Sequence, residues 1–240
     1  MRILDYNIVT KLPKLPLHNK VVINTINPHS YCVAEKDPSF KSALLASDFL
    51  LPDGIGIVWA GKMLKNKKFN KIAGYDIFVH LLAYLEKTKG TCFFLGASNE
   101  TLSLIDAKAK IEYPNIRIGS YSPPFKSEFT VDDSLEMCNQ VNEFGPDVLF
   151  VGMTAPKQEK WVADNKNDLD VQITCCIGAV FDFYAGTVKR PSQFWINIGL
   201  EWLPRFLKDP KRLASRNLVS TPKFIVEVLS LKYFGKHFIN

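Results

Sequence analysis

The 240-residue sequence has no run of 18 or more uncharged apolar residues, so no segment is expected to span a membrane as a helix. Its first residues lack the long apolar core of a secretory signal. The five cysteines, at positions 32, 92, 138, 175 and 176, are odd in number and lack metal-ligand spacing, which argues against a disulfide framework and a zinc site. These absences together predict a protein of a reducing, cytoplasmic compartment.

Two nucleotide-binding signatures are also missing. Gly54 and Gly56 are followed by Ile57, Val58 and Trp59, so the G-x-G-x-x-G fingerprint of dinucleotide-binding enzymes is not completed. A Walker A motif is absent as well. The sequence therefore argues against NAD-dependent enzymes and P-loop ATPases.

The composition and the charge distribution are informative. Hydrophobic residues make up 47% of the chain, enough for a sizeable core. From position 189 to 240 there are ten Lys or Arg residues against three Asp or Glu, a net charge of +7, whereas the rest has 20 against 21. The net charge of +6 therefore comes entirely from the C-terminal fifth, which predicts an anionic partner for that end.

Strands and helices are expected to alternate along the first 188 residues. Buried strands are predicted at 21–26, 49–51, 91–95, 116–119, 147–151 and 171–177. A helix at 131–144 is expected to turn Val131, Leu135, Cys138 and Val141 inward. Such alternation predicts a Rossmann-like α/β core over residues 1–188, with a mostly parallel sheet and helices on both faces. Residues 189–240 would form a helical appendage.

Asp53 is predicted to stand where a buried strand turns into a helix. Phe49 to Leu51 form the apolar run, and Gly54 loosens the backbone before the helix. In open α/β sheets, ligands bind outside the carboxyl ends of the strands. A carboxylate there can take a proton from an incoming hydroxyl. The alternative is that Asp53 merely caps the following helix.

Other strand-to-helix corners carry polar residues or glycine. Thr25 and Asn27 follow the first buried strand, where Asn27 is also a good helix N-cap before a proline. Gly96, Gly152 and Gly178 follow three further strands and would leave room for the phosphates and ribose of a nucleotide-type ligand. The alternative is that these glycines end strands for packing reasons.

The C-terminal fifth is both basic and aromatic. Phe194, Trp195, Trp202 and Phe206 lie close to Arg205. This combination is typical of helices that lie in a membrane interface and contact anionic headgroups. A pair of core helices with solvated charges is the alternative, and DNA binding ranks lowest because the segment is rich in large aliphatic residues.

A set of ordered motifs between residues 20 and 218 resembles a known family. The motifs are Thr25-x-Asn27, Pro52-Asp53-Gly54, Gly74-x-Asp76, Phe94-Leu95-Gly96, Gly152-x-x-x-Pro156-Lys157-Gln158-Glu159-x-x-Trp161, Gly178-Ala179-x-Phe181-Asp182-x-x-x-Gly186, Arg190-Pro191, and Leu200-Glu201-Trp202-x-x-Arg205-x-x-x-x-Pro210-x-Arg212-x-x-Arg216. In combination they are similar to the WecG/TagA/CpsF family of bacterial glycosyltransferases.

The resemblance implies an inverting, metal-independent transfer of a sugar from a UDP-sugar to an undecaprenyl-diphosphate that already carries one sugar. The sugar would be of the N-acetylmannosaminyl or glucosyl type, used in cell-surface or exopolysaccharide synthesis. The protein would work without a cofactor as a peripheral protein on the cytoplasmic face of the plasma membrane, with an anionic membrane surface but no nucleic acid as partner. A homo-oligomer is one expectation for its assembly.

The resemblance also implies roles for the residues at the corners. Asp53 would be the base, because inversion is a single displacement in which the attacking hydroxyl loses its proton. Thr25 and Asn27 would orient the donor sugar or the acceptor. Gln158 and Glu159 would hydrogen-bond sugar hydroxyls, although a glutamate near a helix start is also favoured by the helix dipole.

Further roles concern the nucleotide and the diphosphates. Asp182 would hold the uridine ribose or base, and Tyr121 would stack on it. Arg205, Arg212 and Arg216 would face the diphosphate groups, including that of the acceptor, where guanidinium groups match phosphate oxygens and substitute for a cation.

The sequence departs from the family pattern at two substrate-binding positions. Lys71 stands before the Gly74-x-Asp76 segment where the family generally has arginine, which keeps the charge but loses bidentate binding. The family's Arg-Ala-Pro stretch reads Lys189-Arg190-Pro191, which shifts the position of Arg190.

Two alternatives to this function remain open from the sequence. One is a nucleotide-sugar or polyanion binding module without catalysis. The other is a metal-dependent transferase that uses Asp168 and Asp170, although these residues lie in a polar loop typical of a solvated turn.

Overall fold

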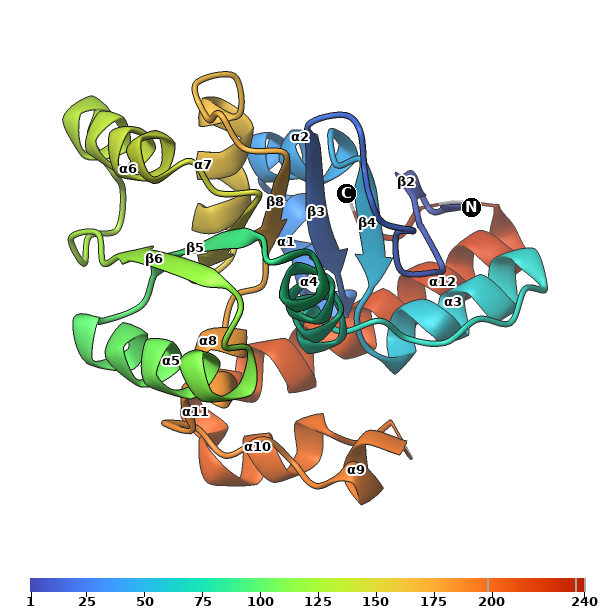
Figure 1. Ribbon diagram of the computed structural model, residues 1–240. Helices are drawn as coiled ribbons and strands as arrows, with labels where there is room; N and C mark the ends of the chain where they lie inside the picture. The colour runs from blue at the N-terminus through green and yellow to red at the C-terminus, as the bar shows by residue number, and fades with distance from the viewer. Residues whose placement is uncertain (198, 236, 240) are drawn as a thin grey trace.

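Six parallel strands form the centre of the molecule in the computed structural model, which describes residues 1–197, 199–235 and 237–239. The strands are β3 (Val21–Ile26), β4 (Phe49–Pro52), β5 (Thr91–Gly96), β6 (Arg117–Tyr121), β7 (Val148–Gly152) and β8 (Ile173–Cys176). Their order in the sheet is β4-β3-β8-β7-β5-β6 (Figure 1). Because all six are parallel, their carboxyl ends share one edge. The predicted α/β class is confirmed.

Helices cover both faces of this sheet. Those of the core are α1 (Pro28–Ala34), α2 (Pro38–Leu45), α3 (Ile55–Lys65), α4 (Gly74–Thr88), α5 (Asn99–Glu112), α6 (Val131–Phe144), α7 (Lys157–Asn165) and α8 (Val180–Ala185). Along β5, Cys92 and Phe94 pack in one cluster, whereas Phe93 and Leu95 pack in another on the opposite face. A sheet that is buried on both sides explains why its strands read as continuous apolar runs.

The inward face of α6 differs from the prediction. Cys138 and Val141 are buried as expected, and Met137 joins them. Val131 and Leu135, however, are 84% and 58% exposed, so the prediction was wrong for both. The helix packs on the sheet through its C-terminal half, and its first turn projects into solvent.

In the part of the chain that the structure describes, four helices and a π-helical segment follow the core. They are α9 (Gln193–Asn197), α10 (Trp202–Lys208), α11 (Pro210–Ala214), the π-helical η1 (Ser215–Ser220) and α12 (Thr221–Phe234). Among these, α9 and α10 lie apart from the sheet, below the body of the molecule in Figure 1. Helix α10 buries none of its residues. None of the helices in the described ranges combines the length and the apolar character needed to cross a bilayer.

The last helix, α12, belongs to the packed core. Phe224 and Val228 are fully buried in a cluster with residues of α1, α2 and α3. The Phe224 ring meets that of Tyr31 edge-on, with centroids 5.3 Å apart. Thus only part of the expected appendage stands apart from the α/β core, because α12 packs into the layer of helices formed by α1, α2 and α3.

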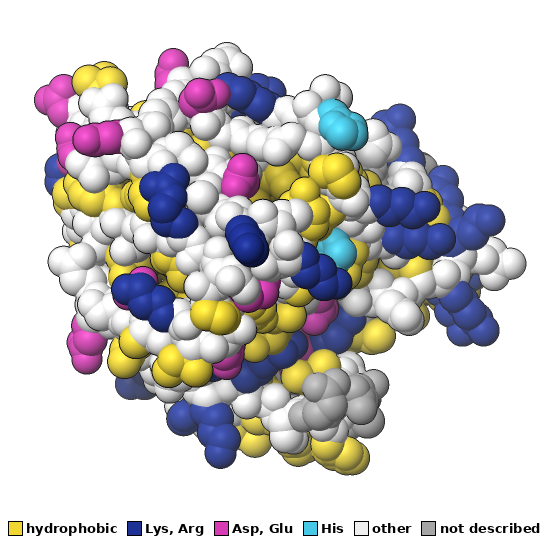
Figure 2. Space-filling view, viewed as in Figure 1, with side chains coloured by type: hydrophobic (Ala, Val, Ile, Leu, Met, Phe, Trp, Pro, Cys, Tyr) yellow, Lys and Arg dark blue, Asp and Glu magenta, His cyan; other side chains and the backbone are white. Residues whose placement is uncertain are grey.

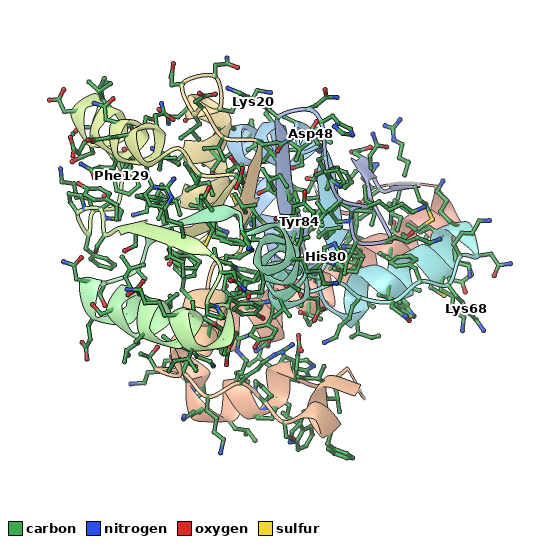
Figure 3. All side chains as sticks on the ribbon, viewed as in Figure 1. Lys20, Asp48, Lys68, His80, Tyr84 and Phe129 are labelled. Atoms are coloured by element: carbon green, nitrogen blue, oxygen red, sulfur yellow. The ribbon has the colours of Figure 1, made fainter. Side chains whose placement is uncertain are left out.

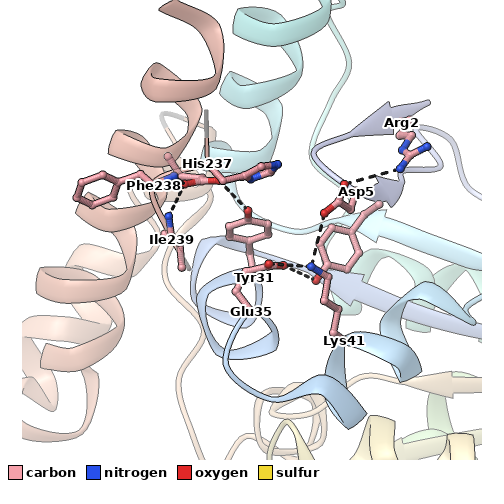
Figure 4. Close-up of polar contacts among 10 residues, drawn as sticks. Arg2, Asp5, Tyr31, Glu35, Lys41, His237, Phe238 and Ile239 are labelled. Atoms are coloured by element: carbon pink, nitrogen blue, oxygen red, sulfur yellow. Dashed lines mark hydrogen bonds and ion pairs between the residues drawn. The ribbon is translucent and has the colours of Figure 1, made fainter. Parts of the chain in front are cut away.

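A buried carboxylate ties α12 to the segment that follows it. Glu227 accepts hydrogen bonds from the backbone N–H groups of Phe238 (2.5 Å) and Ile239 (2.7 Å). It also contacts Nδ1 of His237 at 2.6 Å and the hydroxyl of Tyr31 at 3.3 Å (Figure 4). These partners compensate for burying the charge.

Candidate functional site

Asp53 stands directly after β4, at the carboxyl edge of the sheet. Its N–H donates to the carbonyl of Ile26 (2.9 Å) at the end of β3, while the N–H of Ile72 donates to the carbonyl of Pro52 (2.8 Å). Gly54 is the N-cap of α3 with a φ of 86°, and no side chain caps this helix. Asp53 is therefore not a helix cap. A Cβ on Gly54 would meet no atom within 4 Å, so open space adjoins this corner.

Four charged side chains from distant parts of the sequence act on the Asp53 carboxylate. Burial raises the pKa of Asp53 above its ordinary value. Among the charges, Arg216 has the largest effect and lowers the pKa, Glu201 raises it, and Lys71 and Arg205 lower it. A carboxylate with a raised pKa is a stronger base, while the three cations keep its ionised form accessible. The C-terminal segment thus brings a glutamate and two arginines to the corner that Asp53 occupies.

Lys71 and Glu201 form an ion pair next to Asp53. Nζ of Lys71 lies 2.7 Å from Oε2 of Glu201, and the two side chains are only 17% and 25% exposed. Lys71 belongs to the segment between α3 and α4, whereas Glu201 directly precedes α10. The pair therefore fastens the start of α10 to the carboxyl edge of the sheet.

Arg216 is held by the π-helical segment η1. The carbonyl of Arg216 accepts hydrogen bonds from the N–H and the hydroxyl of Thr221, the latter at 3.1 Å. π-Helical turns occur often at functional sites because they redirect a side chain. Burial and the charge of Arg216 also lower the pKa of His29, whose Nδ1 lies 2.9 Å from Oγ of Ser220. The neutral form of His29, in the first turn of α1, is thus favoured beside the arginine.

Two further predicted residues pack against helices of the core, Arg205 from α10 and Arg190 from the segment between α8 and α9. The guanidinium carbon of Arg205 lies 5.0 Å from the ring centre of Phe183 in α8. The guanidinium carbon of Arg190 lies 4.0 Å from the ring centre of Tyr75, and its Nη2 lies 4.0 Å from Oδ1 of Asp76, at the start of α4. The predicted side chain of Arg212 lies outside what the structure describes.

The polar residues after β3 have different surroundings. Asn27 is the N-cap of α1, as its position before proline predicts, and its Oδ1 accepts hydrogen bonds from the N–H groups of His29 and Ser30, both at 3.0 Å. Thr25 is partly exposed and pairs in register with Leu51 of β4. Thr25 therefore lies near the end of β3, the strand next to β4, and Asn27 directly after it.

Gln158 and Glu159 are buried, unlike side chains that meet a substrate at an open surface. Oε1 of Gln158 accepts hydrogen bonds from the N–H groups of Met153 (3.2 Å) and Gly178 (3.1 Å), and its Nε2 donates to Glu159 (2.8 Å). Gln158 thus connects the loops after β7 and β8. Burial raises the pKa of Glu159, and its second oxygen has no partner among the described residues.

The glycines after the strands have packing reasons of their own. A Cβ on Gly152 would come within 2.1 Å of the Phe181 ring, and a Cβ on Gly96 would come within 2.6 Å of the Gly152 carbonyl oxygen. A Cβ on Gly74 would meet its nearest neighbours at 3.2 Å and 3.3 Å, a tight contact but a milder one. At Gly178, with a φ of 55°, the nearest atom would be 3.6 Å away, so here the backbone conformation favours glycine.

The residues expected to hold the nucleotide are spread along the edge. Asp182 lies in α8, after the central strand β8, and is partly exposed. Tyr121 ends the edge strand β6, five strand positions from β4, or roughly 24 Å at about 4.8 Å per strand. Tyr121 therefore does not reach Asp53.

Asp168 and Asp170 are remote from this edge. They precede β8 and so lie at the amino edge of the sheet, where Oδ1 of Asp170 is 3.2 Å from Nζ of Lys20 and where Figure 3 labels Lys20. No group of three or more His, Cys, Asp or Glu residues suited to a metal ion occurs within residues 1–197, 199–235 and 237–239. This loop is a surface turn.

Comparison with known proteins gives the site a context. The model of the glycosyl transferase WecG/TagA/CpsF family matches residues 7–237. The chain belongs to this family. A relative from Bacillus subtilis (strain 168), named N-acetylglucosaminyldiphosphoundecaprenol N-acetyl-beta-D-mannosaminyltransferase, is 34% identical over 208 residues, which cover 87% of this chain and 78% of the relative.

Other members of the WecG/TagA/CpsF family carry the same name. One from Bacillus spizizenii (strain ATCC 23059 / NRRL B-14472 / W23) is 33% identical, with 86% of this chain and 78% of the relative covered. One from Staphylococcus aureus (strain MW2) is 27% identical, with 89% and 82% covered. The family resemblance that the motifs predicted is confirmed. As a glycosyltransferase of this family the chain is an enzyme, and not a binding module without catalysis.

Sequence reasoning gave no role to two residues of this glycosyltransferase, Glu201, which acts on Asp53, and His29, which Arg216 affects. Glu201 was part of a quoted motif, but its pairing with Lys71 depends on how α10 folds back. His29 follows the Asn27-Pro28 helix start and could have been noted as a titratable group at a strand-to-helix corner. Its contact with Ser220 spans 191 residues and has no sequence signal.

Proposed function

We propose that this chain transfers an N-acetylmannosaminyl group from a UDP-sugar to N-acetylglucosaminyl-diphosphoundecaprenol, with inversion at the anomeric carbon. The observation that carries the proposal is the carboxylate of Asp53 directly after β4, at the carboxyl edge, on which Arg216, Glu201, Lys71 and Arg205 act. The names of the relatives supply the sugar and the acceptor.

The reaction requires one proton transfer and one displacement. The acceptor hydroxyl gives its proton to the carboxylate of Asp53, and its oxygen forms a bond to the anomeric carbon of the donor. The bond between that carbon and the β-phosphate oxygen of UDP breaks, and its electron pair stays on the diphosphate. Arg216 and Arg205 stabilise this charge, because guanidinium groups form charge-assisted hydrogen bonds with phosphate oxygens.

Asp53→Asn tests this assignment. The amide keeps the shape of the side chain but cannot accept the proton, so kcat should fall by a factor of about 10² to 10⁴. UDP release and the glycolipid product would be measured together by liquid chromatography with EDTA present, and UDP-sugar binding by calorimetry. The matched control is Asp106→Asn, on the solvent side of helix α5, where Asp106 pairs with Lys110. Turnover by Asp53→Asn at the rate of the control would remove Asp53 from the mechanism.

We further propose that α9 and α10 lie on the cytoplasmic leaflet of the plasma membrane. Phe194 and Leu207 are 64% and 71% exposed, and Trp202 is 39% exposed, beside the basic residue Lys208. Aromatic and aliphatic side chains flanked by cations suit an interface with anionic lipids.

Substitution is a better test of this proposal than truncation, since deleting everything after residue 189 would also remove the buried residues of α12. Phe194→Ser/Leu207→Ser should weaken cosedimentation with phosphatidylglycerol vesicles at least tenfold. Ile111→Ser/Val131→Ser removes two comparably exposed apolar residues from α5 and α6 and should change nothing. Equal vesicle binding by both double variants would refute the docking surface.

A further inference from the structure

An apolar cavity lies beside the proposed base and has no role in the chemistry described so far. It has a volume of about 570 Å³ and is lined by Ile55, Val58, Trp59, Lys62, Lys68, Phe69 and Asn70. Its walls are α3 and the segment 66–73, which runs back alongside that helix toward α4 (Figure 1). The volume falls within the range of roughly 300–1,000 Å³ that is usual for small-molecule sites.

The cavity begins next to Asp53. Ile55 is two residues beyond Asp53 and is half exposed. Ile55, Val58, Trp59 and Lys62 follow one another at helical spacing i, i+3, i+4 and i+7, so they form one stripe along α3. A ligand that leaves the Asp53 corner along this stripe meets apolar side chains first and a lysine about 10 Å further on, at about 1.5 Å per residue.

The packing of the chain fixes the cavity walls. A Cβ on Gly61 would come within 2.3 Å of the Phe69 ring, so this glycine allows the ring to lie directly against α3. Trp59 and Phe69 both pack against the buried cluster that includes residues of α1 and α12. At the end of the cavity nearest Asp53, the Gly199 backbone lies against Ile55. Gly199, between α9 and α10, is thus at the start of the stripe.

The far end of the cavity is strongly basic. Lys62, Lys65, Lys67 and Lys68 are all exposed, and Lys68 is labelled at this tip of the molecule in Figure 3. Figure 2 shows Lys and Arg side chains gathered there, at the end where α3 stops. Each lysine near an anionic leaflet adds about 1 kcal/mol of attraction to the membrane surface. The cavity therefore leads from the catalytic corner to a surface that suits a bilayer.

We infer that this cavity receives the first isoprenoid units of the acceptor's polyprenyl chain. The acceptor sugar has to reach Asp53 while the rest of its chain stays in the membrane, so the units nearest the diphosphate must cross between the two. An apolar stripe from Ile55 to Trp59, ending at lysines that meet anionic headgroups, provides this path. The inference rests on the proposed acceptor and adds a binding site for its lipid part.

Chain-length dependence tests the inference. Synthetic acceptors with the same sugar diphosphate on one isoprenoid unit or on three would be compared in detergent without vesicles. The wild-type enzyme should show a higher kcat/KM for three units. Val58→Glu places a charge in the stripe and should reduce this preference about tenfold. Val131→Glu makes the same change at an exposed helical position of α6 and should keep the wild-type preference.

The outcomes separate this inference from the proposed function. If the wild-type enzyme transfers sugar but Val58→Glu keeps the full preference for three units, the cavity is not the lipid path. If Val58→Glu keeps the preference for three units in detergent and, in separate cosedimentation with phosphatidylglycerol vesicles, loses only vesicle binding, the stripe is a membrane contact and the inference is overturned. If the wild-type enzyme transfers no sugar to either acceptor, the proposed function itself fails.

Discussion

The ion pair between Lys71 and Glu201 predicts opposite pH effects from its two halves. Glu201 raises the pKa of Asp53 and Lys71 lowers it. If the ionised form of Asp53 is the base, the acidic limb of the pH profile of kcat/KM follows this pKa. Glu201→Gln should therefore extend activity to lower pH, whereas Lys71→Met should confine it to higher pH.

The pairing of the two charges determines how the variants behave together. At 2.7 Å separation Lys71 and Glu201 form a compact neutral dipole whose effects on Asp53 largely cancel. Each single substitution leaves the other charge unbalanced, so the acidic limb should move to lower pH in Glu201→Gln and to higher pH in Lys71→Met, and the double variant should lie near wild type.

The assay is initial-rate UDP release from pH 4 to 9 for the four proteins. Lys110→Met removes a lysine of an exposed pair in α5 and serves as the control. The electrostatic reasoning would be refuted if the acidic limb moved in the same direction in both single variants. It would also be refuted if the limb of the double variant lay far from that of wild type.

Three further predictions concern stability, each measured by urea unfolding. The pKa of Glu159 is raised in the folded protein, so ionisation of its carboxyl group opposes folding as pH rises. Glu159→Gln should therefore be more stable than wild type at pH 8 but not at pH 4. A gain in stability that does not depend on pH would contradict this. Gly152→Ala would force a Cβ against the Phe181 ring and should lower the free energy of unfolding by about 1–3 kcal/mol. Adding Phe181→Leu should restore part of this loss. An unchanged free energy of unfolding would mean that the ring is free to move. Glu227→Leu leaves the N–H groups of Phe238 and Ile239 without their acceptor and should cost about 2–4 kcal/mol, whereas an unchanged midpoint would show that this buried carboxylate contributes nothing net.

Local sequence signals were sufficient for the α/β class and for the position of Asp53. The strand at 21–26 was predicted with the observed bounds, and the one at 49–51 to within one residue, because buried parallel strands are continuous apolar runs. Asn27 capped its helix as expected, since capping depends on neighbouring residues alone. The open corner at Gly54 followed from the proline and glycine around Asp53.

Contacts between distant segments could not be predicted in this way. Val131 looked buried by periodicity, yet which turn of α6 meets the sheet depends on the loops at its ends. The basic and aromatic C-terminal segment did not reveal that Phe224 is buried whereas Phe194 is exposed. Glu201 and Arg216 reach Asp53 only because the chain returns across the carboxyl edge.

The packing of α12 on α3 has a consequence for synthesis in the cell. Lys65 and Thr221 are 156 positions apart, so at about 5–20 residues per second the ribosome needs roughly 8–30 s to make the partner of α3. During that interval the apolar residues of α1 and α3 that later cover Phe224 stay open to solvent. This layer therefore closes last, and the nascent chain is most prone to aggregate, or to require a chaperone, while it waits.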